Sequence, residues 1–167
     1  MLEIKTYSFI YNQINDRIQL IGNSKIADSR IDLWITRRMT HILIKLSNDV
    51  LGSTNPKTLH LSPDINQEIH SFEFQRSQQT IKSEAQTITL IDKEPTLIIK
   101  VDIKTLPNYF EWLFYDISDV PVAFGNLTRT QMHALNGLIT DQAIKAEWGL
   151  THAINKIEKD GKDKKIH

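Results

Sequence analysis

Apolar and polar residues alternate with a period of two near the start of the chain, at residues 4–11 and again at residues 17–21. Such alternation is typical of strands that bury one face. The turn-forming residues between them, 12–16, predict a hairpin. Residues 30–35 continue the pattern, so we expect a third strand there.

The pattern changes to helical spacing after Thr36, whose side-chain oxygen fits a helix N-cap. Gly52 stands where such a helix would end. Between them, one helix face collects the apolar residues Met39, Ile42, Leu43, Leu46 and Val50. Ser62 and Pro63 form a second helix start, which predicts a shorter helix running toward residue 82.

The second half of the chain again shows strands followed by a helix. Residues 87–91, 97–104, 109–115 and 120–124 each predict a strand. Thr128 and Gln131 then form a capping-box pattern. One face of the helix that they start is apolar and contains Met132, Leu135, Ile139, Ala143 and Ala146.

Strands joined by short turns pair antiparallel, because parallel neighbours need a long crossover connection. We therefore predict an α+β protein with one mostly antiparallel, strongly curved sheet of about six to seven strands and about three helices on one face. A chain of 167 residues is close to the size of one domain, so residues 1–154 are expected to form a single domain. The charged residues 155–167 are expected to be a disordered tail.

Charge and cysteine content narrow the function. Lysine and arginine together number 20, as do aspartate and glutamate, so a formal net charge of zero does not favour nucleic-acid binding. The absence of cysteine removes disulfides and thiolate chemistry and is compatible with a cytoplasmic protein. No apolar run is long enough for a membrane span or a signal peptide. The histidines and carboxylates lack metal-ligand spacing, and no cofactor-binding motif occurs, so we expect neither metal nor cofactor.

Two helix starts resemble each other. The same four residue types recur at identical offsets, as Thr36, Arg37, His41 and Leu43 in one segment and Thr128, Arg129, His133 and Leu135 in the other. One interpretation is a duplicated β-β-β-α unit. The other is convergence, because helix starts favour threonine and leucine is a common residue.

Three arginines stand at helix starts, where backbone N–H groups attract anions although the helix dipole disfavours cations. The candidate set for binding an anion or a partner is Arg37, Arg38, His41, Arg129 and His133. The alternative is that Asp32 and other acids neutralise the arginines at the surface, while the histidines only pack.

The densest aromatic cluster lies in residues 109–115. Tyr109, Trp112 and Tyr115 are candidates for a dimer interface or for a surface on which bases stack. The alternative is a central strand whose aromatic side chains belong to the core.

Three functions are consistent with these patterns. The leading hypothesis is a non-catalytic binding module that associates with itself or with another protein, since no catalytic motif is present. The second is single-stranded nucleic-acid binding through the arginines and aromatics, which requires the cations to gather on one face. The third is a small enzyme acting on an anionic metabolite, with His41 or His133 as its acid–base group.

Overall fold

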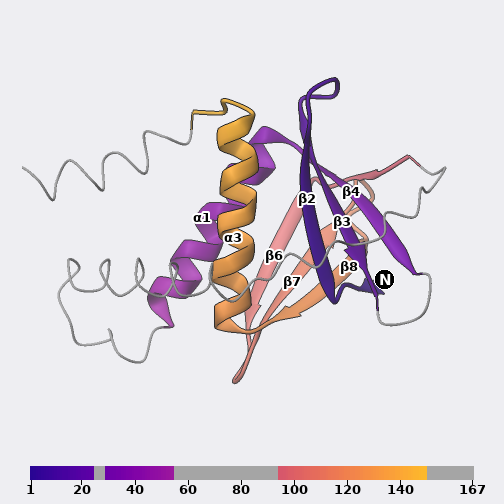
Figure 1. Ribbon diagram of the computed structural model, residues 1–167. Coiled ribbons are helices and arrows are strands. Elements are labelled where there is room, and N and C mark those ends of the chain that lie inside the picture. The colour runs from indigo at the N-terminus through magenta and orange to yellow at the C-terminus, as the bar shows by residue number, and fades with distance from the viewer. Residues whose placement is uncertain (25–28, 55–93, 150–167) are drawn as a thin grey trace, which may run out of the picture.

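The computed structural model describes residues 1–24, 29–54 and 94–149, in which the chain forms eight strands and two helices (Figure 1). The predicted second helix, the predicted strand at 87–91 and the predicted tail lie outside the described residues. The elements before the gap are β1 (Leu2–Glu3), β2 (Thr6–Asn12), β3 (Arg17–Asn23), β4 (Arg30–Ile35) and α1 (Arg37–Ser53). Those after it are β5 (Thr96–Leu97), β6 (Lys100–Thr105), β7 (Phe110–Tyr115), β8 (Pro121–Leu127) and α3 (Arg129–Lys145).

The strands form two mixed sheets of four, in the orders β1-β8-β7-β6 and β2-β3-β4-β5. The prediction of an α+β protein is confirmed, but the prediction of one sheet with about six to seven strands is wrong. The hairpins β2–β3, β3–β4, β6–β7 and β7–β8 are antiparallel as expected. Two short pairs, β1 with β8 and β4 with β5, are parallel and join strands distant in sequence.

Each half of the chain begins with a strand that passes from one sheet into the other. The N–H of Ile4 donates to the carbonyl of Phe124 in β8 (2.7 Å), whereas the next N–H, of Lys5, donates to Asn23 in β3 (2.8 Å). Residues 98 and 99 repeat this arrangement between β4 and β7. The alternation of buried and exposed residues changes phase at both bends, where two consecutive residues are exposed: Lys5 and Thr6 in one, Ile99 and Lys100 in the other. The predicted strand at 97–104 is divided in the structure between β5 and β6.

The order of four strands and a helix therefore occurs twice, in the first half (residues 1–54) and in the second half (residues 94–149). Both helices have 17 residues, and each follows a threonine cap. The cap side chains of Thr36 and Thr128 accept hydrogen bonds from the N–H groups of Met39 and Gln131. The capping box at Thr128 is confirmed, since Gln131 also accepts from the Thr128 N–H.

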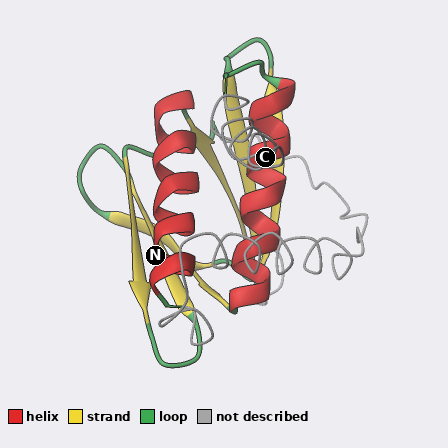
Figure 2. Cartoon of the chain, turned by 90° about the vertical axis from the view of Figure 1, so that its left-hand side faces the viewer, coloured by secondary structure: helices red, strands yellow, loops and turns green. Residues whose placement is uncertain are grey.

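The helices lie side by side on the same side of the strands (Figure 2). They run antiparallel, because Asn136 of α3 donates to Asn48 of α1 (2.7 Å), and the start of α3 contacts the end of α1. Helix α3 packs on β2 and helix α1 packs on β6. Each helix thus covers an edge strand of the other half.

A single hydrophobic cluster connects both halves, and its largest fully buried members are Trp112, Phe114, Ile4, Ile18, Leu20, Leu33, Ile35, Leu43, Leu51, Ile98, Leu127 and Met132. Full burial of one such aliphatic side chain stabilises a fold by roughly 1.5–3 kcal/mol. Close packing extends to the backbone at Gly125, where an added Cβ would lie 1.4 Å from the Tyr7 hydroxyl oxygen. Only glycine fits there, because Tyr7 of the first half lies against β8 of the second.

Candidate functional site

The arginine that starts α3 is used inside the fold. Arg129 donates through Nη2 to the Leu51 carbonyl (2.7 Å) and through Nη1 to the Thr54 hydroxyl (3.3 Å), both at the end of α1. A cation at a helix C-terminus is favourable because the dipole is negative there. The unfavourable position of Arg129 on its own helix is therefore offset by the end of its neighbour.

The arginines that start α1 lie at the opposite end of the helix pair. Both Arg37 and Arg38 are exposed, and Arg37 Nη2 lies 3.8 Å from the position of a Cβ built on Gly149, just beyond α3. A helix of 17 residues is roughly 25 Å long, so these two arginines and Arg129 are far apart. The structure does not gather the predicted cations on one face.

The two histidines occupy matching places, four residues after Arg37 and Arg129 and hence on the same side of each helix. His133 is buried, with 5% of its surface exposed. The Nε2 atom of His41 is also buried, and the described residues offer it no hydrogen-bond partner. Because the helices run antiparallel, His41 near the start of α1 and His133 near the start of α3 lie toward opposite ends of the helix pair.

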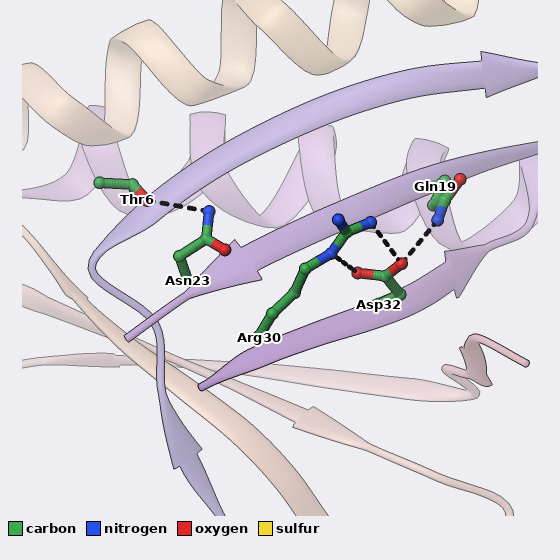
Figure 3. A network of polar contacts seen from close by, with 5 residues as sticks. All are labelled: Thr6, Gln19, Asn23, Arg30 and Asp32. Carbon is green, nitrogen blue, oxygen red and sulfur yellow. Dashed lines mark hydrogen bonds and ion pairs between the residues drawn. The ribbon is translucent and has the colours of Figure 1, made fainter. Parts of the chain in front are cut away.

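Asp32 does not neutralise Arg37 or Arg38 but belongs to a network on sheet β2-β3-β4-β5 (Figure 3). Its two carboxylate oxygens accept from Arg30 Nε and Nη2, both at 2.7 Å, and Gln19 of β3 donates to the second oxygen at 2.9 Å. The side chains of Arg30 and Asp32 are only 10% and 8% exposed. In this bidentate ion pair, the charge of Asp32 is neutralised by Arg30 of the same strand.

A second polar cluster fastens the end of α3 to the β2–β3 turn. Asp16 accepts from the indole Nε1 of Trp148 and from the hydroxyl of Tyr11, each at 2.9 Å, and the two rings meet edge to face. These hydrogen bonds, and the charge of Arg37, lower the pKa of Asp16. The bond to Asp16 in turn raises the pKa of Tyr11. We call Asp16, Tyr11 and Trp148 the Asp16 clasp. No sequence pattern indicated it, because 132 positions separate Asp16 from Trp148.

The three aromatic candidates in and beside β7 do not form one surface. Trp112 is fully buried and packs edge to face on Tyr7 and Phe114, so its indole is a core group. Tyr109 is exposed at the β6–β7 turn, and Tyr115 ends the strand. A strand of six residues separates these tyrosines by roughly 20 Å.

Beyond Tyr115, large apolar side chains are exposed around the β7–β8 turn. Ile99, Ile117 and Val120 have exposed fractions of 46%, 81% and 53%. Their segments meet at the same end of β7, because the Ile99 N–H donates to the Tyr115 carbonyl and the Asp116 N–H donates to the Val120 carbonyl. We call these three residues the apolar turn. Residues 116–119 lie between two predicted strands, with the β-branched Ile117 inside this segment and Val120 directly after it.

One lysine and two aspartates border the apolar turn. Lys100 Nζ lies 3.3 Å from Asp119, 3.6 Å from Asp102 and 4.3 Å above the Tyr115 ring centre. The hydrogen bond to Asp119 raises the pKa of Lys100. Burial and a hydrogen bond to Asp102 raise the pKa of Tyr115. An apolar patch rimmed by polar groups is typical of protein interaction sites.

The described residues contain no group of three histidines or carboxylates that could hold a metal ion, and no helix there is long and apolar enough to cross a membrane. Comparisons with protein-family models, with curated proteins and with solved structures find no match to this chain.

Proposed function

We propose that the protein is a non-catalytic interaction module that associates with a second copy of itself through the apolar turn. The observation that carries this proposal is the joint exposure of Ile99, Ile117 and Val120 beside the Lys100–Tyr115 pair. Single exposed apolar residues are common on protein surfaces, whereas adjacent ones with a polar rim favour an interface.

The chemistry of the turn suits contact with the same turn of another copy. Burial of isoleucine and valine side chains lowers the free energy by about 25 cal/mol per Å² of apolar surface removed from water. Around them, Lys100 and Asp119 offer a cation and an anion within one small area. In a twofold contact, each copy can therefore pair its lysine with the partner's aspartate.

The test is sedimentation velocity of the full chain over a wide range of protein concentration. The mean sedimentation coefficient should rise with concentration for the natural protein, and Ile117→Lys should weaken the association roughly tenfold or more. The lysine acts by placing a hydrated charge where an apolar contact forms.

Ile14→Lys is the matched control. Ile14 is 95% exposed but lies on the β2–β3 turn between the polar residues Gln13 and Asn15. Its replacement should leave the association unchanged. A natural protein that stays monomeric throughout, or equal effects of both lysines, would contradict the proposal.

A further inference from the structure

Each half of the molecule is completed by the other. The two-residue strands β1 and β5 pair with β8 and β4 of the opposite half, and the bends that follow them are held by Ile4 N–H to Phe124 (2.7 Å) and Ile98 N–H to Trp34 (3.0 Å). We call the place where β1 pairs with β8 the first corner and the place where β5 pairs with β4 the second corner. Both corners form only when both halves are present.

The helices show the same dependence. Helix α1 packs on β6 and helix α3 packs on β2, where Gln142 accepts the Tyr11 N–H at 3.0 Å. Arg129 binds the end of α1, and Trp148 binds Asp16. A half without its complement would expose the apolar face of its helix to water, at a large cost in free energy.

One peptide segment is the sole covalent link between the halves. The chain has no cysteine, so no disulfide joins them, and residues 55–93 make the connection. An extended chain of about 39 residues spans up to roughly 130 Å. This length reaches the complementary half of the same copy or of a neighbouring one.

We propose that a second copy of this chain can supply the complementary half, which gives a dimer in which the first half of each copy packs on the second half of the other. Every contact between halves is reproduced in this dimer, so protein concentration decides between the closed monomer and the exchanged dimer. The proposal uses the interface between the halves and does not depend on the apolar turn.

A pair of cysteines across a corner distinguishes the two states. Glu3 and Phe124 are register partners on β1 and β8, at the spacing of adjacent strands. In the Glu3→Cys/Phe124→Cys variant, oxidation links a monomer to itself but links the two chains of an exchanged dimer to each other. The variant is refolded from denaturant under reducing conditions at several concentrations, then oxidised and run on a non-reducing gel.

We expect a covalent dimer whose ratio to monomer rises about tenfold for each tenfold rise in monomer concentration. The control is Thr6→Cys/Asn23→Cys, because these register partners lie within the first half and should give no covalent dimer. Only monomers from the corner pair, or equal amounts of dimer from both pairs, would overturn the proposal.

Two further variants keep the outcomes separate. Leu33→Cys/Thr96→Cys places the same test at the second corner, should the first pair prevent folding. Ile117→Lys added to the corner pair should leave the covalent dimer unchanged. A loss of covalent dimer on this addition would mean that the apolar turn, rather than exchange of halves, brings the two copies together.

Discussion

The two halves follow the same path but carry different chemistry. At matching places, 92 positions apart, the structure puts a threonine cap, an arginine on the first turn and a core leucine: Thr36, Arg37 and Leu43 in one half, Thr128, Arg129 and Leu135 in the other. In the order of elements, the place that corresponds to the β7–β8 turn is the connection between β3 and β4, where the Ser24 N–H donates to the Ser29 carbonyl.

This difference indicates that the repeated residues and the apolar turn have separate roles. The threonines begin the helices and the leucines fill the core, while Arg129 binds the end of α1. These repeated residues therefore support the fold, and an anion site at the arginines and histidines stays a prediction. The groups best placed to meet a partner, Ile99 and Ile117, belong to one half only. Common ancestry of the two halves remains a hypothesis that their matching order of elements supports.

The largest expected effect tests the equivalence of the two cores. Leu43→Ala and Leu135→Ala each remove a buried side chain from matching helix positions. Each should lower the free energy of unfolding by about 2–5 kcal/mol, because a cavity replaces close packing. Urea denaturation measures both losses, and a cost for one leucine several-fold larger than for the other would break the comparison.

The arginines should differ even though their positions match. Arg129→Ala removes charged hydrogen bonds to Leu51 and Thr54 and should lower stability by about 1.5–3 kcal/mol. Arg37→Ala, at an exposed site, should change it by less than about 0.5 kcal/mol. Urea denaturation again provides the measurement. Equal costs would mean that Arg37 also joins the helices.

The Asp16 clasp has no counterpart at the matching place of the second half, since position 108, at the same offset, is asparagine. Because its hydrogen bonds lower the pKa of Asp16, the carboxylate stabilises the fold fully above the ordinary value of 3.8 and loses this effect as the pH falls through the lower folded value. Asp16→Asn should therefore reduce the difference in melting temperature between pH 7 and pH 3. Unchanged pH dependence would show that the carboxylate charge does not hold Trp148.

Local features of the fold could be predicted from the sequence, but contacts between distant segments could not. Helix starts at Thr36 and Thr128 follow from capping chemistry, and the hairpins follow from turns between alternating runs. The bend at residues 4 and 5 is marked only by two successive exposed residues, Lys5 and Thr6, which do not reveal that the partner of the chain changes there from β8 to β3. The helix-end role of Arg129 was equally hidden, since it depends on a helix that ends 76 positions earlier, at Ser53.

Contact between two copies through the apolar turn is tested most directly by a dilution series of ¹⁵N-labelled protein followed by amide chemical shifts. Signals of Ile99, Ile117 and Val120 should move with protein concentration, because the apolar turn meets a second copy. Signals of His41 and His133, on the repeated helices, should stay in place. Shifts confined to the helix pair, or no shifts at any concentration, would contradict the claim that the unrepeated turn carries the function.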